Sequence, residues 1–377
     1  MKIKDFIDLN LDGYYKWDEI KKIGEFTCLK ACDQDPHWHA EGNVWIHTVN
    51  VCKHASDIAH FYNNYDLREI FLAAALFHDI GKPITSKADK NGRIHSYGHE
   101  EAGEKITRII LWDEDIEKRE HVCALVRWHM EILHVTEHKD YLERLVEISK
   151  EVNLQLLIDL KRCDLQGSLT YDEQRGTDFQ TLQTIMNIVN IVGLGNFAKL
   201  PLKSQLRNFG RHNVDKVYVM VGLPGSGKST WIQEHCTKGN KEDNGTNWRI
   251  VSRDVIRVGM GICEPGKKVV GTREQEEAVS ERFDAELLDA VKNHYTVLID
   301  NINLSRKYRD KYKELLRNYN IKWVYVYLQA PTLDDNKERR KSDIQPEFFD
   351  SMQQRFDWPR ASEYDELIIK VSNDKLG

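Results

Sequence analysis

Histidine and aspartate side chains in the first half of the chain have the types and spacing expected of a divalent metal site. They are His47, His78, Asp79, His99, His129 and Asp164. The adjacent pair His78-Asp79 follows the apolar segment FLAAALF, and His47 also lies among apolar residues. Apolar surroundings keep imidazoles neutral, and imidazole mixed with carboxylate suits Mn, Fe, Co, Ni or Zn better than Mg or Ca. Each histidine alone could be an ordinary core or surface residue, but the ordered set indicates a metal site.

A glycine-rich segment in the second half has the residues needed to hold nucleotide phosphates. The sequence GLPGSGKS at 222–229 fits G-x-x-x-x-G-K-[ST] and lies between a strand pattern and a helix pattern. Its candidate binding residues are Gly222, Gly225, Ser226, Gly227, Lys228, Ser229 and Thr230. In such a loop the amides face phosphate oxygens, the lysine neutralises the β- and γ-phosphates and the serine hydroxyl binds Mg²⁺. The pattern predicts binding of ATP, or another nucleoside triphosphate, with Mg²⁺.

The next strand pattern favours a kinase over a motor or a switch protein. The segment RIVSRDVIR at 249–257 places Asp254 directly after a strand and Arg257 one helical turn further on. A carboxylate beside the γ-phosphate can accept the proton of an attacking hydroxyl, which makes it a general base. Asp254 alone could equally be a helix cap. Beside the phosphate loop, the catalytic role is the better interpretation.

The surrounding sequence predicts two domains of different class. Helical periodicity dominates the first 199 residues, with helices expected at 43–62, 66–79, 100–111, 120–133, 141–152 and 154–165. Short β-branched runs then alternate with helical stretches, and strands are expected at 217–221, 249–252, 296–299, 323–328 and 367–371. We therefore expect an all-α domain at 1–199, a linker at 200–214 and an α/β P-loop domain with a mainly parallel sheet at 215–377.

Composition and charge fit an ordinary globular protein of 377 residues. Its formal net charge of −6 argues against indiscriminate coating of nucleic acid. The predicted linker is locally basic, with Lys203, Arg207 and Arg211 and no acidic residue, and could be a solvated connector or could track phosphates. Apolar runs are too short to span a membrane, the first residues lack a signal-peptide pattern, and the 7 scattered cysteines fit free thiols. We therefore expect a cytoplasmic protein.

Residues 217–372 resemble the 5′-hydroxyl polynucleotide kinases of the phage end-healing type. The likeness rests on GLPGSGKSTW, VSRDVIR, VLIDNINLS and an arginine pair near residue 340. The resemblance implies that Asp254 deprotonates a 5′-hydroxyl and that Arg257 contacts the acceptor phosphate.

The arginine pair would belong to a lid that closes over ATP. The resemblance assigns this role to Arg339, with Arg340 as the near alternative. The family usually has a second lid arginine about one helical turn earlier, where this chain has Asp335 or Asn336. The register of the lid is therefore left open.

Residues 38–164 resemble the HD-domain phosphohydrolases, which are all-helical enzymes. The likeness rests on the string FHDIGKP and on the order H…HD…H…H…D. It implies a primary metal site formed by His47, His78, Asp79 and Asp164.

The same resemblance implies that His99 and His129 belong to a second metal ion, with Asp79 bridging, so that the site holds one or two transition-metal ions. Lys82 would contact the substrate phosphate, and metal-activated water would attack phosphorus. The segment HWHAE at 37–41 could line the pocket or could be a polar loop, and His121 is a spare candidate ligand.

The combination resembles bifunctional HD phosphatase–kinase proteins over nearly the whole chain. It predicts RNA end healing: phosphorylation of 5′-OH ends with ATP, and removal of 2′/3′ or 2′,3′-cyclic phosphate ends. RNA ends would be the substrate, with DNA also open, and an RNA ligase could act afterwards. Two alternatives stay open: a small-molecule nucleoside or nucleotide kinase fused to a nucleotidase, and a nucleotide-sensing regulator. The oligomeric state is not indicated.

Overall fold

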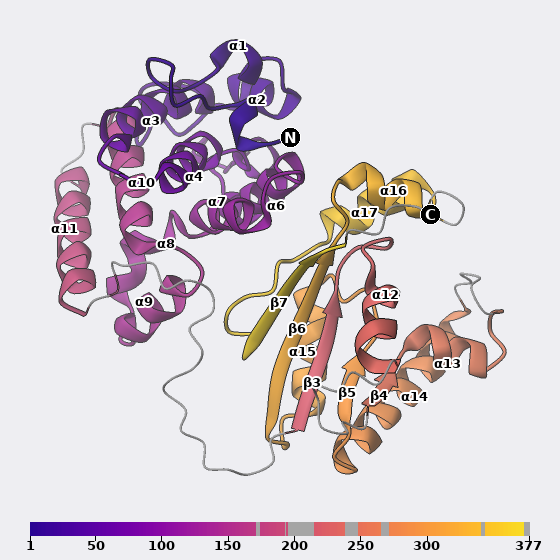
Figure 1. Ribbon diagram of the computed structural model, residues 1–377. Coiled ribbons are helices and arrows are strands. Elements are labelled where there is room, and N and C mark those ends of the chain that lie inside the picture. Colours follow the sequence, from indigo (N-terminus) through magenta and orange to yellow (C-terminus); the bar gives the residue numbers. More distant parts are fainter. Residues whose placement is uncertain are drawn as a thin grey trace. The chain divides into compact units, whose positions relative to one another are not determined.

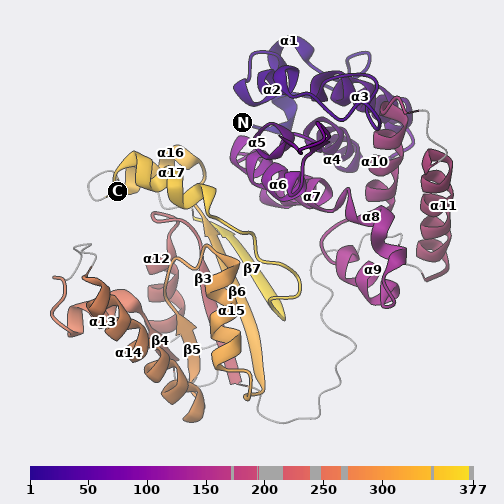
Figure 2. The same ribbon diagram turned by 180° about the vertical axis from the view of Figure 1, so that it is seen from behind.

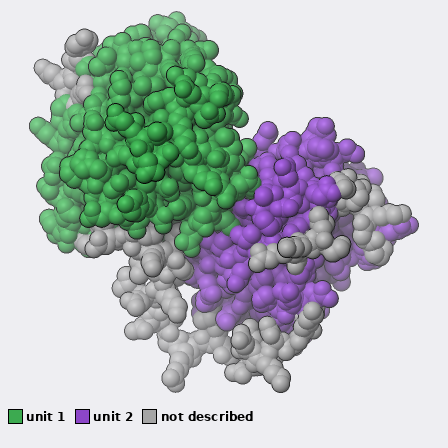
Figure 3. All heavy atoms as spheres, turned by 45° about the horizontal axis from the view of Figure 1, so that its top comes forward, with its two compact units in different colours: residues 1–200 green, residues 201–377 purple. Residues whose placement is uncertain are grey.

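The computed structural model describes residues 1–170, 174–192, 194, 215–237, 248–264, 271–340 and 344–372. The chain divides into two compact units, Met1–Leu200 and Pro201–Gly377 (Figure 3). The predicted linker at 200–214, with its basic residues, lies outside the described residues.

The first unit is almost entirely helical. Its longer helices are α3 Val44–Ala59, α4 Tyr65–Phe77, α6 His99–Ile110, α7 Ile116–Trp128, α9 Tyr141–Ser149, α10 Leu154–Gly167 and α11 Gln174–Val192. Its short elements are η1 Ile3–Asp5, α1 Trp17–Ile20, α2 Gly24–Cys28, η2 Leu29–Ala31, α5 Lys82–Thr85, β1 Lys87–Ala88, β2 Ile94–His95, α8 Glu131–His134 and η3 Val135–Glu137. The two short strands pair antiparallel. The predicted all-α class is confirmed apart from this hairpin.

Capping side chains explain where the long helices begin. The side-chain oxygens of Asn43, Asn64 and Asn153 each accept a backbone amide in the first turn of α3, α4 and α10. Asp115 does the same for α7, accepting from the amide of Lys118. The helix predicted at 120–133 was wrong at both ends, because α7 begins after the Asp115 cap and ends at Trp128, before α8.

Helix α4 forms the centre of the first unit and packs against α3, α7 and α10 (Figures 1 and 2). Every residue from Ile70 to Phe77 is buried. Because the helix is surrounded on all sides, its carboxyl end lies inside the unit. His78 and Asp79, which follow that end directly, are therefore buried as well.

The second unit is a parallel sheet with helices on both faces, as predicted. Its strands are β3 Asp215–Val221, β4 Trp248–Val251, β5 Thr296–Ile299, β6 Ile321–Gln329 and β7 Glu366–Val371. Its helices are α12 Lys228–Ile232, η4 Gln233–Thr237, α13 Arg253–Gly259, α14 Arg273–Lys292, α15 Arg306–Leu315, α16 Leu333–Arg340 and α17 Pro346–Gln354. The strand order is β4-β5-β3-β6-β7, and every pairing is parallel.

Strand β3 occupies the middle of this sheet, between β5 and β6 (Figure 1). The chain moves from β3 to β4 on one side and later crosses to β6 on the other. In open α/β sheets, ligands bind beyond the carboxyl ends of the strands, at the point where the connections from one strand to the next change direction across the sheet. The glycine-rich loop leaves β3 at this point.

None of the helices among the described residues combines the length and the apolar composition that crossing a bilayer requires. All seven cysteines have free thiols, as the sequence predicts.

Candidate metal centre and phosphate-binding loop

The structure brings all six predicted metal-binding side chains together inside the first unit. They come from five places: His47 on α3, His78 and Asp79 after α4, His99 at the start of α6, His129 after α7, and Asp164 on α10. All six residues are buried.

Asp79 lies between two groups of these side chains and presents a different oxygen to each. Its Oδ2 is 3.2 Å from Nε2 of His78 and 3.6 Å from Nε2 of His47. Its Oδ1 is 3.3 Å from Nε2 of His99 and 3.8 Å from Nε2 of His129. The arrangement is that of two neighbouring metal-capable groups with one shared carboxylate.

Asp164 completes the first group. Its Oδ1 lies 2.9 Å from Nε2 of His47 and 3.8 Å from Nε2 of His78. Burial alone would lower the pKa of His47, but its contacts with Asp164 and Glu41 outweigh burial and raise that pKa to about 9. The surrounding carboxylates thus favour a positive charge at this position.

The hydrogen bonds of the other three histidines show which ring nitrogen is available to a metal. Nδ1 of His78, His99 and His129 donates to a backbone carbonyl at 2.9, 2.8 and 2.7 Å, respectively. A carbonyl can only accept, so in the neutral ring Nε2 carries the lone pair.

The Nε2 atoms of the four histidines converge in two pairs. The Nε2 atoms of His99 and His129 are 3.2 Å apart, and those of His47 and His78 are 3.3 Å apart. Burial, followed by the neighbouring His99 and His78 rings, holds the pKa of His129 well below its usual range, so this ring stays neutral. Converging imidazole nitrogens and carboxylate oxygens fit a divalent cation in each group.

Two lysines hold the carboxylates of the cluster. Nζ of Lys82 is 2.7 Å from Oδ2 of Asp79 and also donates to Oε1 of Gln34 at 2.8 Å. Nζ of Lys161 is 2.6 Å from Oδ2 of Asp164. Burial favours neutral carboxyls, but these ammonium groups and the histidines outweigh it, so both pKa values lie well below the usual range.

Sequence reasoning anticipated Lys82 but missed Lys161 and Gln34. Lys161 precedes Asp164 by three positions on α10, and this helical spacing was the available signal. Of the segment at 37–41, His39 and Glu41 join the cluster, with Oε1 of Glu41 close to both His39 and His47. His121 lies elsewhere: its Nε2 accepts from the amide of Asn153 at 3.1 Å.

At Gly81 the backbone that follows α4 lies close to the backbone of the first turns of α6. A Cβ atom at this position would lie 2.1 Å from the carbonyl oxygen of His99 and 2.6 Å from the amide nitrogen of Gly103. Both atoms belong to the backbone, so a side-chain rotation cannot move either of them away from the added Cβ. Only glycine lets His99 come this close to Asp79.

Gly81→Ala should therefore destabilise the first unit by about 1–3 kcal/mol, as other overpacked sites do. Thermal unfolding of the purified chain measures the effect. Gly176→Ala is a matched control because a Cβ there meets nothing within 4 Å and lies on α11. The control should gain about 0.5–1 kcal/mol. Equal unfolding temperatures for the two variants would contradict the steric argument.

In the second unit, the predicted phosphate-binding loop connects β3 to α12. Gly227 has φ of 94°, which is the left-handed region, and a Cβ there would lie 2.7 Å from Cβ of Ser372. Nζ of Lys228 donates to the carbonyl oxygens of Gly222 and Leu223 at 2.7 and 2.9 Å. Ser229 is exposed in the first turn of α12. The loop thus offers a lysine and a hydroxyl at a helix start, as predicted.

Asp254 lies in the first turn of α13, and its side chain is 82% exposed. Its Oδ1 accepts from Nη1 of Arg257 at 2.6 Å. Arg257 also donates to both carboxylate oxygens of Glu276 on α14, at 2.9 and 2.8 Å. Sequence reasoning missed Glu276, which lies 19 residues from Arg257. This fork holds the guanidinium beside Asp254.

Asp300 follows β5 and lies near the same loop. Burial raises the pKa of its carboxyl, the charge of Lys228 lowers it, and the charge of Asp254 raises it. The net result is a raised pKa for Asp300, which lies with Lys228 and Asp254 at the carboxyl end of the sheet.

Helix α16 packs directly on the phosphate-binding loop. The buried Asn336 donates from Nδ2 to the carbonyl oxygen of Pro224 at 3.0 Å. Nη1 of Arg339 donates to the carbonyl oxygen of Gly225 at 3.1 Å and to Oγ of Ser372 at 2.6 Å. Asn336, three positions before Arg339 and one of the two candidates for the earlier lid position, thus binds the loop backbone.

Arg340 also lies beside the loop, because a Cβ at Gly225 would come within 3.2 Å of Cγ of Arg340. The predicted lid residues therefore surround the loop, with Arg339 making the direct contact.

Two family models match the chain over these two sites. Residues 44–164 match a model described as an HD domain, and residues 217–359 match one described as an AAA domain. The chain is an HD domain joined to a P-loop kinase-like domain. The HD domain holds the histidine–aspartate cluster, and the P-loop domain holds Lys228, Asp254 and Arg339.

Three similar proteins each cover part of this chain. The CC-adding tRNA nucleotidyltransferase of Thermus thermophilus is 46% identical over 63 residues, which are 16% of this chain and 14% of that protein. The chain thus spans a small part of this curated relative. Among solved structures, a chain of the Pnkp1/Rnl/Hen1 complex is 25% identical, with 32% of this chain and 37% of that one covered and a TM-score of 0.26.

Kti12 of Chaetomium thermophilum in complex with ADP-AlF3 is 15% identical, with 42% of this chain and 91% of that one covered and a TM-score of 0.32. TM-scores this low do not establish a common fold over the aligned length.

Proposed function

We propose that this protein heals broken RNA ends. The HD domain would remove 2′/3′ or 2′,3′-cyclic phosphate ends, and the P-loop domain would phosphorylate 5′-OH ends with ATP. Many nucleases leave these two kinds of end, and a conventional RNA ligase cannot join them. The two reactions together would restore a pair of ends that a ligase can seal.

The observation that carries this proposal is that two phosphate-directed sites occur in one chain. One is the pair of histidine groups that share Asp79. The other is the phosphate-binding loop after β3, with the exposed carboxylate of Asp254 after β4 at the same end of the sheet. Because this carboxylate is open to solvent, its position also suits an acceptor hydroxyl at the end of a long strand.

In the HD domain, His47, His78 and Asp164 would hold one divalent ion with Oδ2 of Asp79. His99 and His129 would hold a second ion with Oδ1 of Asp79. Such ions supply a water-derived nucleophile at neutral pH and neutralise charge on phosphate oxygens. Mn, Fe, Co, Ni and Zn all suit these ligands.

The chain's own residues then position the substrate phosphate. The ammonium group of Lys82, held by Gln34 and Asp79, would contact a phosphate oxygen. Burial of the whole cluster limits the access of bulk water.

In the P-loop domain, Asp254 would accept the proton of the 5′-hydroxyl while the hydroxyl oxygen bonds to the γ-phosphorus and ADP leaves. Lys228 would turn from the loop carbonyls to the β- and γ-phosphates, and Ser229 would bind Mg²⁺. Arg257, which donates to Asp254, would orient that carboxylate and contact the acceptor phosphate. Arg339 would close the lid over ATP, with Arg340 beside it.

RNA is the proposed substrate, and one relative's name supports it. The matching Thermus enzyme is named for its action on tRNA. A cytoplasmic location and a ligase acting on the healed ends belong to the same proposal. The net charge of −6 instead mildly favours the first alternative, a nucleoside or nucleotide kinase with a nucleotidase. A regulator that only senses nucleotides has no need of a base such as Asp254.

The test uses a single RNA with a 5′-OH and a terminal 3′-phosphate, incubated with ATP and Mn²⁺ or Mg²⁺, with both ends resolved. We expect a 5′-phosphate and a free 3′-hydroxyl. Asp254→Asn should slow 5′ phosphorylation about 10²–10⁴-fold, the range of a general base, and leave 3′ dephosphorylation unchanged. Phosphorylation of a free nucleoside but not of the RNA would favour the first alternative, and no turnover at either end would favour the regulator.

A further inference from the structure

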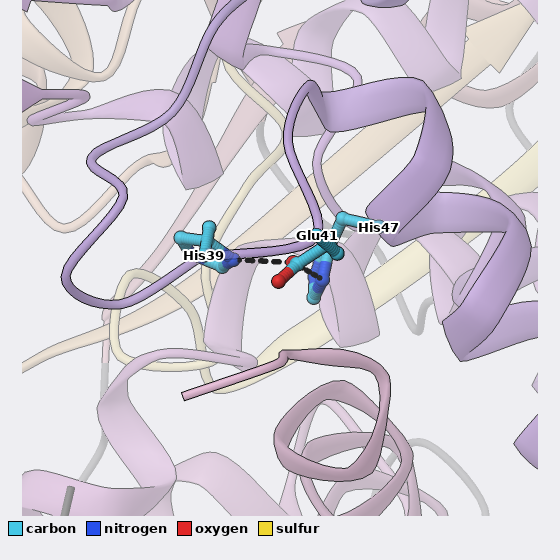
Figure 4. Close-up of side chains that lie close together, drawn as sticks. All are labelled: His39, Glu41 and His47. Carbon is cyan, nitrogen blue, oxygen red and sulfur yellow. Dashed lines mark hydrogen bonds and ion pairs between the residues drawn. The ribbon is translucent and has the colours of Figure 1, made fainter. Parts of the chain in front are cut away.

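Glu41 is a buried carboxylate that bridges two histidines at the edge of the metal cluster. Its side chain is 1% exposed. Its Oε1 lies 2.8 Å from Nδ1 of His39 and 2.9 Å from Nδ1 of His47 (Figure 4). The contact with His47 is an ion-pair contact, and Nδ1 of His47 has no hydrogen bond among the described residues. From the sequence alone, the segment at 37–41 could either line the pocket or form a polar loop.

Within the described part of the chain, Nδ1 of His47 has no backbone carbonyl as a hydrogen-bond partner, unlike Nδ1 of the other three histidines of the cluster. Those three Nδ1 atoms donate to backbone carbonyls within their own helices or turns, and Nδ1 of His99 also lies 3.3 Å from Oε2 of Glu100. Nδ1 of His47 faces the ionised side chain of Glu41 instead. A carboxylate behind a metal-binding histidine fixes the ring orientation and tautomer and makes the opposite nitrogen a stronger donor.

Glu41 also connects two of the three chain segments that supply the first metal group. Its Oε2 accepts from the amide of Leu169 at 2.7 Å, and the amide of Ala40 donates to the carbonyl oxygen of Leu169 at 2.9 Å. Leu169 lies just beyond α10, which carries Asp164. The side chain of Glu41 thus contacts both His47 and the segment that follows the Asp164 helix.

We propose that Glu41 is a positioning residue for one of the two metal groups, the group formed by His47, His78 and Asp164 with Asp79. It holds Nδ1–H of His47 so that the Nε2 lone pair points at the cation. The group formed by His99 and His129 has no contact with Glu41 among the described interactions and should not depend on it. This inference rests on the proposed metal site of the HD domain.

The test measures binding of Mn²⁺ alone to the full-length, metal-stripped chain, with free Mn²⁺ followed by electron paramagnetic resonance. A His99→Ala background isolates the group around His47. In that background Glu41→Gln should weaken Mn²⁺ binding about 10–100-fold, which is typical for loss of such an outer partner. Glu41→Asp, which keeps the charge, should recover part of the affinity.

Two controls separate positioning from folding. His54→Ala removes a partly exposed histidine of the same helix α3, paired with Asp57 outside the cluster, and should leave Mn²⁺ affinity unchanged. The thermal unfolding of the metal-free Glu41→Gln chain should match that of its parent.

Unchanged Mn²⁺ affinity in Glu41→Gln would overturn the proposal. The proposal would also be overturned if Glu41→Gln lowered the unfolding temperature and weakened Mn²⁺ binding equally at the His99–His129 group. Binding at that group is measured in a His47→Ala background. If the parent chain binds no Mn²⁺ at all, the proposed metal site itself fails, which is a different result.

Discussion

Replacing Asp79 by asparagine should abolish removal of the terminal phosphate while leaving 5′ phosphorylation intact. Both oxygens of Asp79 are in use, one facing His78 and the other facing His99. Asparagine keeps the shape but loses the charge and turns an NH₂ group toward one set of ligands. Metal ions contribute several kcal/mol to such reactions, so a loss of about 4 kcal/mol corresponds to about a thousandfold in rate.

The measurement is phosphate release from an RNA with a 3′-phosphate, together with metal analysis of the purified chain. Wild type should carry up to two metal equivalents and Asp79→Asn fewer. Asp159→Asn is a matched control, because Asp159 is also buried in the HD domain but binds the hydroxyl of Tyr62 and not the cluster. An Asp79→Asn variant that keeps both metals and full phosphate release would remove the bridging role.

Lys228→Ala should have the reciprocal effect, with 5′ phosphorylation lost and phosphate removal retained. The ammonium group is the cation of the phosphate-binding loop, and it also holds the loop carbonyls of Gly222 and Leu223. Its loss removes charge stabilisation of the transferring phosphoryl group. Loss of one such stabilising contact slows reactions about 10²–10³-fold.

The measurement is transfer of labelled phosphate from ATP to a 5′-OH RNA. Lys322→Ala removes an equal charge from the same domain, at a surface ion pair with Glu366, and such pairs contribute about 0–1 kcal/mol. That control should phosphorylate RNA like wild type. Full kinase activity in Lys228→Ala would exclude the loop as the ATP site.

Much of the fold was predictable because its signals are local. The β-branched strands, the glycine-rich loop and the helical periodicity each depend on neighbours within a few residues. All five predicted strands are present, and the helix predicted at 120–133 is present as α7 with different ends, its start missed because the cap at Asp115 was not recognised. The six metal-capable residues were also found from sequence, because their order along the chain is itself a pattern.

Tertiary structure alone decided how these residues are used. The sequence did not indicate that the two oxygens of Asp79 would face different histidine pairs, or that Glu41 would lie behind His47. Nor did it indicate that Glu276 would hold Arg257 or that Asn336 would bind the loop at Pro224. Each of these contacts joins segments whose register depends on how whole helices pack. Sequence therefore determined which groups are available, and packing determined which atoms face one another, because hydrogen bonds and metal ligation depend on distances and angles that no residue spacing encodes.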